Sequence, residues 1–157
     1  MSAPSRMALV MLSPQAMTSE EKTVLIVEDN ADWRELLSTI LRRSGYQVVV
    51  AVTGEDGVRQ AIATRPHLIL MDLGLPKMSG DEATVLIKTN PATKDIPIVI
   101  QTGFGTSPSA ERAMQAGAVD IMQKPISISD IQSILKKHLP AETRAPSPTY
   151  FLSATQI

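Results

Sequence analysis

Five polar residues of this 157-residue chain stand where apolar segments end, and their types could support chemistry. Glu28 and Asp29 follow the first such segment, and Asp72, Thr102 and Lys124 follow three later ones. Three carboxylates that meet in a fold raise one another's pKa unless a cation neutralises them. Oxygen ligands in an incomplete protein cage suit a hydrated Mg²⁺ ion. The pattern therefore predicts an acidic Mg²⁺ site that is supplemented by an ammonium and a hydroxyl group.

These are the groups that phosphoryl transfer needs. Catalysis of that reaction depends mainly on positioning and charge neutralisation, which a carboxylate nucleophile, a divalent metal, an ammonium and a hydroxyl provide together. Taken singly, Asp72 could be a turn or cap residue, and Lys124, which precedes Pro125, could be a surface loop residue. The set favours the chemical interpretation because its members follow four different apolar segments.

The segments that must position these residues alternate between strand-like and helix-like patterns. The candidate strands are residues 23–27, 47–51, 67–71, 96–100 and 119–122. Three of them contain continuously apolar runs, at 24–27, 68–71 and 98–100. Such runs are typical of central strands in a parallel sheet that is covered on both faces.

Helical periodicity separates the candidate strands. Apolar residues recur at helical spacing in the first such segment, at Trp33, Leu36, Leu37, Ile40 and Leu41. The later helices are expected to begin after Thr53, Ser79 and Ser107, and Ser129 with Gln132 is expected to form a capping box for the last helix. Asp56 and Asp120, in helix or loop contexts, are expected to be solvated.

This order of elements predicts an α/β fold of the doubly wound (βα)₅, flavodoxin-like kind. Right-handed crossovers place helices on both faces of a five-stranded parallel sheet. In such sheets the reactive site lies at the carboxyl ends of the strands. We expect the folded domain to span residues 22–139, with a flexible N-terminal extension at 1–21 and a C-terminal tail or linker stub at 140–157, too short to fold as an output domain.

Composition excludes several classes of function. A net charge of −1 and a pI near 6.1 provide no basic footprint for nucleic acid. The chain has no cysteine, so disulfides, thiolate zinc sites and cysteine nucleophiles are excluded. The apolar run at residues 7–12 is too short for a signal peptide or a membrane span, which predicts a cytoplasmic protein without membrane contact.

The motifs at these positions resemble those of response-regulator receiver domains in two-component signalling, as in the chemotaxis regulator family. The resemblance covers roughly residues 22–139 and rests on the segments VLIVEDN (24–30), MDLGLPKMSG (71–80), TG (102–103), GAVD (117–120) and KP (124–125). It implies that Asp72 is the phosphoacceptor. It also implies that Asp29, Asp72 and the backbone carbonyl of Gly74 ligate Mg²⁺, and that Glu28 helps through water.

The same resemblance assigns roles to the remaining site residues. Thr102 would hydrogen-bond a phosphoryl oxygen, Lys124 would pair with the phosphate or with Asp72, and the Lys124–Pro125 peptide bond would be cis. Two positions depart from the family pattern: Ile121 stands where an aromatic switch residue is usual, and Gly103 replaces the commoner alanine. Phosphorylation is therefore expected to act mainly through the loop that starts at Thr102 and includes Phe104.

The expected partners are a histidine kinase or histidine phosphotransfer protein and a downstream protein target, with the chain a monomer or a weak homodimer. The chain would be no enzyme in the usual sense, but a phosphoacceptor domain that assists its own Mg²⁺-dependent phosphorylation and dephosphorylation. A receiver module of a hybrid histidine kinase is a second interpretation. A metal-dependent phosphatase is disfavoured, because Gly74 stands where its second acid is needed.

Overall fold

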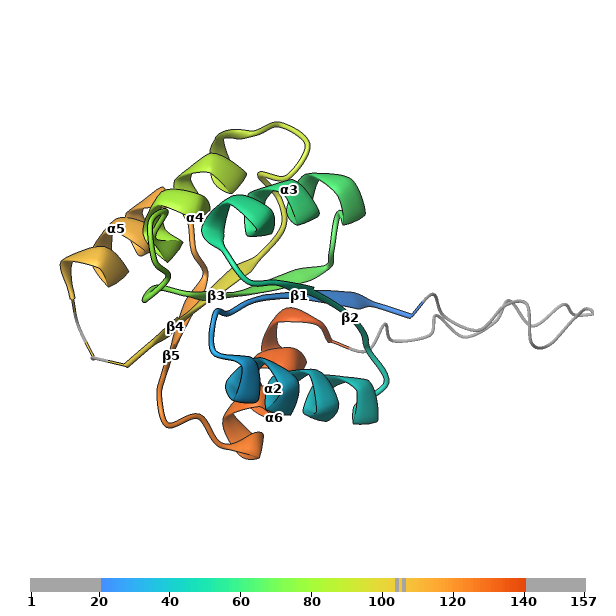
Figure 1. The fold of residues 1–157 in the computed structure, drawn as a ribbon. Coiled ribbons are helices and arrows are strands. Elements are labelled where there is room, and N and C mark those ends of the chain that lie inside the picture. The colour runs from blue at the N-terminus through green and yellow to red at the C-terminus, as the bar shows by residue number, and fades with distance from the viewer. Residues whose placement is uncertain (1–20, 104, 106, 141–157) are drawn as a thin grey trace, which may run out of the picture.

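The computed structural model describes residues 21–103, 105 and 107–140 (Figure 1). Its strands are β1 (Thr23–Val27), β2 (Gln47–Ala51), β3 (Leu68–Asp72), β4 (Ile98–Thr102) and β5 (Asp120–Gln123). Its helices are α2 (Ala31–Arg43), α3 (Gly54–Thr64), α4 (Gly80–Thr89), α5 (Pro108–Ala116) and α6 (Ile128–His138). The strands form one parallel sheet in the order β2-β1-β3-β4-β5, with α3, α4 and α5 on one face and α2 and α6 on the other. The predicted fold class is confirmed.

The two expected extensions, 1–21 and 140–157, lie outside the described residues except for Glu21 and Pro140. Their structure therefore remains a prediction. Within the described part of the chain, no helix is long and apolar enough to cross a membrane.

Three strands begin one or two residues later than the sequence predicts. Pro97 has no N–H for the ladder, so β4 begins at Ile98, although the Pro97 carbonyl still accepts a hydrogen bond of 3.0 Å from Ile69 N. At the other end the ladder includes polar residues, because Asp72 and Thr102 are the last residues of their strands. These two site residues are therefore held by the sheet itself. The corrected bounds are 68–72, 98–102 and 120–123.

Apolar side chains fill both sides of the sheet in alternation. Along β1, Leu25 and Val27 belong to the cluster that packs towards α3, α4 and α5, whereas Val24 and Ile26 belong to the cluster that includes residues of α2 and α6. All five residues of β3 and all five of β4 are buried. A double-sided core of this kind fixes the strand ends firmly, and so fixes the polar groups that stand on them.

Side-chain caps set most helix starts where the sequence predicts them. Thr53 Oγ1 accepts a hydrogen bond of 3.0 Å from Asp56 N, and Ser107 Oγ accepts one of 3.1 Å from Ala110 N. Gly117 ends α5 with φ +119°, a left-handed conformation that glycine adopts without strain.

The predicted capping box of the last helix is wrong by two residues. Ser127, not Ser129, is the N-cap of α6, and Asp130 takes the place expected for Gln132. Ser127 Oγ accepts from Asp130 N at 3.1 Å, while the Asp130 carboxylate accepts from Ser127 N at 2.8 Å. An aspartate closes the reciprocal pair here as glutamate or glutamine does elsewhere, so the earlier serine starts the helix.

Candidate functional site

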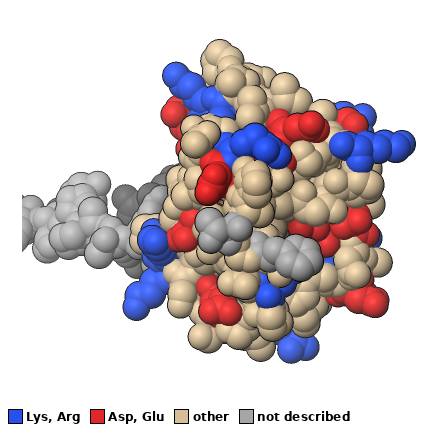
Figure 2. Space-filling model, turned by 90° about the vertical axis from the view of Figure 1, so that its left-hand side faces the viewer, with Lys and Arg blue, Asp and Glu red and all other residues tan. Residues whose placement is uncertain are grey.

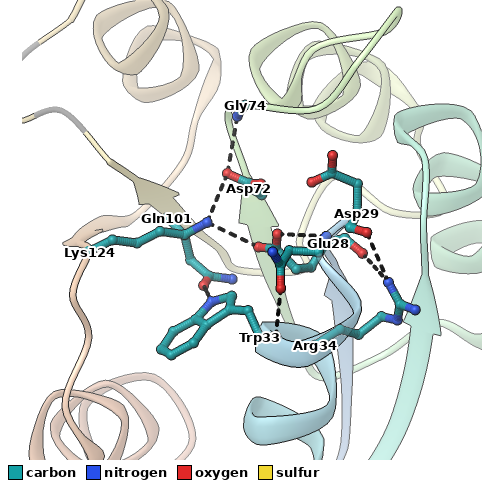
Figure 3. A network of polar contacts seen from close by, with 9 residues as sticks. Glu28, Asp29, Trp33, Arg34, Asp72, Gly74, Gln101 and Lys124 are labelled. Atoms are coloured by element: carbon teal, nitrogen blue, oxygen red, sulfur yellow. Dashed lines mark hydrogen bonds and ion pairs between the residues drawn. The ribbon is translucent and has the colours of Figure 1, made fainter.

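Three carboxylates converge where β1 and β3 end. Glu28 and Asp29 follow β1, and Asp72 closes β3, the neighbouring strand. One oxygen from each of the three lies within 4.8 Å of the others. Glu28 and Asp72 are buried and Asp29 is exposed, so the cluster has a closed inner side and an open outer side. Figure 3 shows the three carboxylates facing a common space.

Lys124 provides the positive charge of the cluster. Its Nζ lies 3.3 Å from Glu28 Oε2 and 3.6 Å from Asp72 Oδ1, so one ammonium is shared by two buried carboxylates. The backbone N–H of Lys124 donates to the Thr102 carbonyl at 2.7 Å, which ties the end of β5 to the end of β4. The Lys124–Pro125 peptide bond is cis, as the resemblance implies.

The electrostatics of Glu28 show how crowded the cluster is. The pKa of Glu28 is raised to about 7: burial raises it most and the charge of Asp72 next, while Lys124 and the hydrogen bond from Asn30 N lower it. A divalent cation at this place would favour the ionised carboxylate. The donors are oxygens without histidine or cysteine, and the pattern fits a hard cation such as Mg²⁺.

The loop after β3 is built tightly around Asp72. Asp72 Oδ1 accepts a hydrogen bond of 3.1 Å from Gly74 N. At Gly80, the first residue of α4, a Cβ atom would collide with the carbonyl oxygen of Asp72. Only glycine lets α4 start this close to the nucleophile candidate, and the helix in turn supports that backbone.

A pocket of about 540 Å³ opens over the carboxylates. Besides the predicted residues Glu28, Asp29, Asp72, Gly74, Thr102 and Lys124, its lining includes Asn30, Leu73, Gly103, Ser107 and Ser109. Every predicted site residue therefore lies at one place. Ser107 and Ser109 belong to the start of α5, so this helix borders the pocket.

Two residues near the site could not be assigned from the sequence. Gln101, inside β4, is completely buried, and its Oε1 accepts a hydrogen bond of 2.9 Å from Trp33 Nε1 on α2. Trp33 packs partly against the core, as expected from its helical spacing, but it also has this polar contact. The signal that could have drawn attention to Gln101 is a polar residue placed between the apolar run at 98–100 and Thr102.

Other predicted features lie away from the pocket or outside the described residues. Asp120 was expected to be solvated, but its Oδ2 pairs with Lys137 Nζ at 2.9 Å and His138 Nε2 at 3.1 Å, because α6 ends beside the start of β5. Ile121 is 38% exposed on β5. Phe104 lies outside the described residues, and its expected role is untested.

The face on which the strands end has mixed charge. In Figure 2, which views the molecule from this side, Lys and Arg side chains are interspersed with Asp and Glu. No broad basic patch covers the part of this face that the described residues form. The distribution gives nucleic acid no electrostatic footprint here.

Comparison with known proteins agrees with this geometry. The family described as response regulator receiver domain matches residues 24–136. The polar-differentiation response regulator DivK of Brucella anthropi is 35% identical over 118 residues, which cover 75% of this chain and 96% of that protein. The phosphate regulon transcriptional regulatory protein PhoB of Pseudomonas aeruginosa is 32% identical over 129 residues, which cover 80% of this chain but 56% of PhoB.

Solved structures lead to the same family. The receiver domain of a sensor histidine kinase from Pseudomonas aeruginosa, which was crystallised with a magnesium ion coordinated in its active-site cleft, superposes with a TM-score of 0.72. The two sequences are 31% identical, and the match covers 77% of this chain and 99% of that one. The chain belongs to the response regulator receiver domain family and is a receiver domain of two-component signalling.

Proposed function

We propose that Asp72 accepts a phosphoryl group from a histidine kinase or a histidine phosphotransfer protein, and that Mg²⁺ assists the transfer. The observation that carries this proposal is the cluster in which oxygens of Glu28, Asp29 and Asp72 lie within 4.8 Å of one another while Lys124 Nζ lies 3.6 Å from Asp72 Oδ1. Receiver domains as a family are signalling domains that respond to such kinases and act on downstream effectors.

The metal site is proposed from the same residues. Asp29, Asp72 and the backbone carbonyl of Gly74 would ligate Mg²⁺, and Glu28 would contribute through water. Bound Mg²⁺ supplies positive charge to the phosphoryl oxygens. The proposal is supported by the all-oxygen donor set and by a similar receiver that holds magnesium in its cleft.

In the proposed transfer, a carboxylate oxygen of Asp72 forms a bond to phosphorus as the bond from phosphorus to the donor's histidine nitrogen breaks. The electron pair of that bond returns to the imidazole. Lys124 and the hydroxyl of Thr102 donate hydrogen bonds to the phosphoryl oxygens, which keeps the acyl phosphate in place. Attack of water on phosphorus later releases phosphate and restores the carboxylate, which ends the signal.

A second candidate is the receiver module of a hybrid histidine kinase. It is favoured by the similarity to a receiver domain that belongs to a sensor histidine kinase. Both candidates use the same site and differ in the donor. Phosphotransfer profiling against a panel of purified kinases distinguishes them, because a module of a hybrid kinase is expected to prefer the kinase core that belongs to its own gene.

The site proposal is tested with acetyl phosphate, a small phosphoryl donor. We expect one Mg²⁺-dependent phosphoryl adduct on the intact protein, located at Asp72 by mass spectrometry, and a loss of more than about tenfold in Asp72→Asn. Asp56→Asn is the matched control, because Asp56 lies on α3 and pairs with Arg59 at 2.7 Å. Normal labelling of Asp72→Asn, or labelling that survives EDTA, would refute the mechanism.

A further inference from the structure

The side-chain amide of Gln101 is buried in β4, directly after the apolar residues 98–100. The side chain is completely buried, and its Nε2 has no hydrogen-bond partner among the residues that the structure describes. Burying an unpaired amide N–H costs free energy that methionine or leucine at this position would avoid. A buried donor of this kind therefore calls for a functional explanation.

The orientation of the amide follows from its one partner. The indole N–H of Trp33 can only donate, so the group that faces it at 2.9 Å must be the Gln101 oxygen. The Nε2 group is thereby turned away from the indole. Trp33 thus holds the carboxamide in a defined orientation, with its two N–H donors directed elsewhere.

Strand register places Gln101 beside the carboxylates. Asp72 and Gln101 are direct partners across β3 and β4, and Glu28 follows Val27, which is the partner of Met71. Val24, Leu70 and Val99 lie two or four residues before these on the same strands, and therefore on the same face. All three belong to the cluster on the α2 and α6 side. Glu28, Asp72 and Gln101 therefore form one row on one face of three adjacent strands, which are spaced by about 4.8 Å. In Figure 3 the carboxamide lies between the indole of Trp33 and the Glu28–Lys124 pair.

The two contacts of Lys124 indicate when the Gln101 donor would be needed. Lys124 Nζ contacts both Glu28 Oε2 and Asp72 Oδ1. When Lys124 turns to a phosphoryl group on Asp72, Glu28 loses its cationic partner while it is still buried. A buried carboxylate that loses a partner needs another donor nearby. The Nε2 group of Gln101 is such a donor in the same row.

We propose that Gln101 is a positioning residue of the phosphorylated state. Its Nε2–H group, oriented by Trp33, donates a hydrogen bond to the Glu28 carboxylate when Lys124 moves to the phosphoryl group. This inference rests on the proposed phosphorylation of Asp72. It assigns to Gln101 an effect on the stability of the phosphorylated form and little effect on the binding of Mg²⁺ alone.

The test separates these two steps in Gln101→Met, which keeps the length of the side chain and removes the amide. Mg²⁺ alone is titrated first, and beryllofluoride, an analogue of the phosphoryl group, is then titrated at saturating Mg²⁺, both followed by NMR of the ¹⁵N-labelled full chain. We expect the Mg²⁺ dissociation constant to stay within about twofold, and the beryllofluoride dissociation constant to rise about tenfold, as for the loss of one hydrogen bond to a charged group. Met122→Leu, a buried apolar change at the β5 partner of Gln101, should alter neither.

A spectroscopic signature accompanies the affinities. The side-chain amide signals that vanish in Gln101→Met belong to Gln101. In the wild-type protein they should move downfield when beryllofluoride binds, because the N–H then donates to a carboxylate. Trp33→Phe keeps the Gln101 amide but removes the indole hydrogen bond that orients it. This variant should therefore also weaken beryllofluoride binding, by a smaller factor than Gln101→Met.

Several results would overturn the inference. Wild-type beryllofluoride affinity in Gln101→Met would do so, and so would an equal loss of Mg²⁺ and beryllofluoride binding, which indicates a structural role only. If Gln101→Met does not fold, unchanged beryllofluoride binding in Trp33→Phe together with a static Gln101 signal in the wild type would overturn it. A wild-type chain that binds no beryllofluoride with Mg²⁺ refutes the proposed function itself, a result distinct from the others.

Discussion

Lys124 is shared between two buried carboxylates, so the charges of Glu28 and Asp72 depend on each other. With one ammonium for Glu28 and Asp72, the two carboxylates compete for compensation. The result is the pKa of about 7 at Glu28, to which burial contributes most and Asp72 next. Protonation of Glu28 near neutral pH follows from this arrangement.

This pKa predicts a pH dependence of stability. Glu28 binds its proton more tightly in the folded chain, because its pKa is raised from its ordinary value of 4.5 to about 7. Folding is therefore favoured below about pH 5, and this advantage declines as pH rises to about 7. In Mg²⁺-free buffer, Glu28→Gln should remove this decline and gain about 1–3 kcal/mol relative to the wild type at pH 8. Urea unfolding at pH 5.5 and pH 8 measures the difference.

Glu35→Gln is the matched control, because Glu35 is exposed on α2. Its stability should follow that of the wild type at both pH values. Saturating Mg²⁺ should stabilise the wild type more at pH 8 than at pH 5.5, since the ionised carboxylates bind it. A Glu28→Gln variant whose stability falls with pH as steeply as that of the wild type would contradict the assignment.

For single residues, the sequence predicted which residues form the site better than it predicted which side chains contact each other. Glu28, Asp29, Asp72, Thr102 and Lys124 could be predicted because each stands at the end of an apolar run, where strands must end together. The partner of Gln101 could not be predicted, because Trp33 is 68 residues away and reaches it only through the packing of α2 on the sheet.

Helices α4 and α5 are joined by an ion pair between a buried aspartate and a largely exposed arginine. Asp81, in the first turn of α4, is 4% exposed, and its Oδ2 accepts a hydrogen bond of 2.8 Å from Arg112 Nε on α5. Burial raises the pKa of Asp81, but hydrogen bonds from Ser79 and Arg112 outweigh it and leave the pKa below its ordinary value. The pair therefore stabilises the contact between the two helices only while the carboxyl is ionised.

Arg112→Met should destabilise the chain by about 1 kcal/mol at pH 7, a value reduced by the exposure of the arginine side chain. A lowered carboxyl pKa adds stability above about pH 4 and loses it as pH falls further, so the difference from the wild type should shrink in acid. Denaturant midpoints at pH 7 and pH 3 measure it. Arg59→Met, which removes an exposed pair within α3, should cost less than about 0.5 kcal/mol.

If Arg112→Met and Arg59→Met reduce the stability by the same amount at pH 7, the ion pair between α4 and α5 has no special weight.

The helices and strands themselves were largely predictable from periodicity and caps. The predictions were wrong where two local signals competed. Ser127 and Ser129 both resemble caps, and only Asp130 decides between them. The pairing of Asp81 with Arg112 depends on how two helices lie on the sheet, which periodicity does not determine.

For the whole molecule, the alternation of strands and helices predicted a parallel sheet with two covered faces, and this is confirmed. Alternation alone does not determine the strand order β2-β1-β3-β4-β5, because several orders are compatible with right-handed crossovers. That order is what places β3 beside both β1 and β4 and brings the carboxylates together.

The signal is predicted to leave the site through the loop between β4 and α5. Ile121 on β5 is stiff at χ1 and has no ring to turn, whereas Ser107 and Ser109 at the start of α5 border the pocket. With beryllofluoride and Mg²⁺, the largest backbone NMR shift changes outside the site should fall within residues 102–109. Changes centred on Ile121 and α6, with this loop unmoved, would contradict the prediction.

The hydrogen bond from Trp33 to Gln101 also has an optical consequence. Trp33 is the single tryptophan of the chain, so the tryptophan fluorescence of the intact protein comes from one ring. That ring touches the residue next to Asp72 in the sheet. The unlabelled protein thus carries its own fluorophore beside the carboxylate cluster, and its emission can follow the state of that cluster in solution without any added dye.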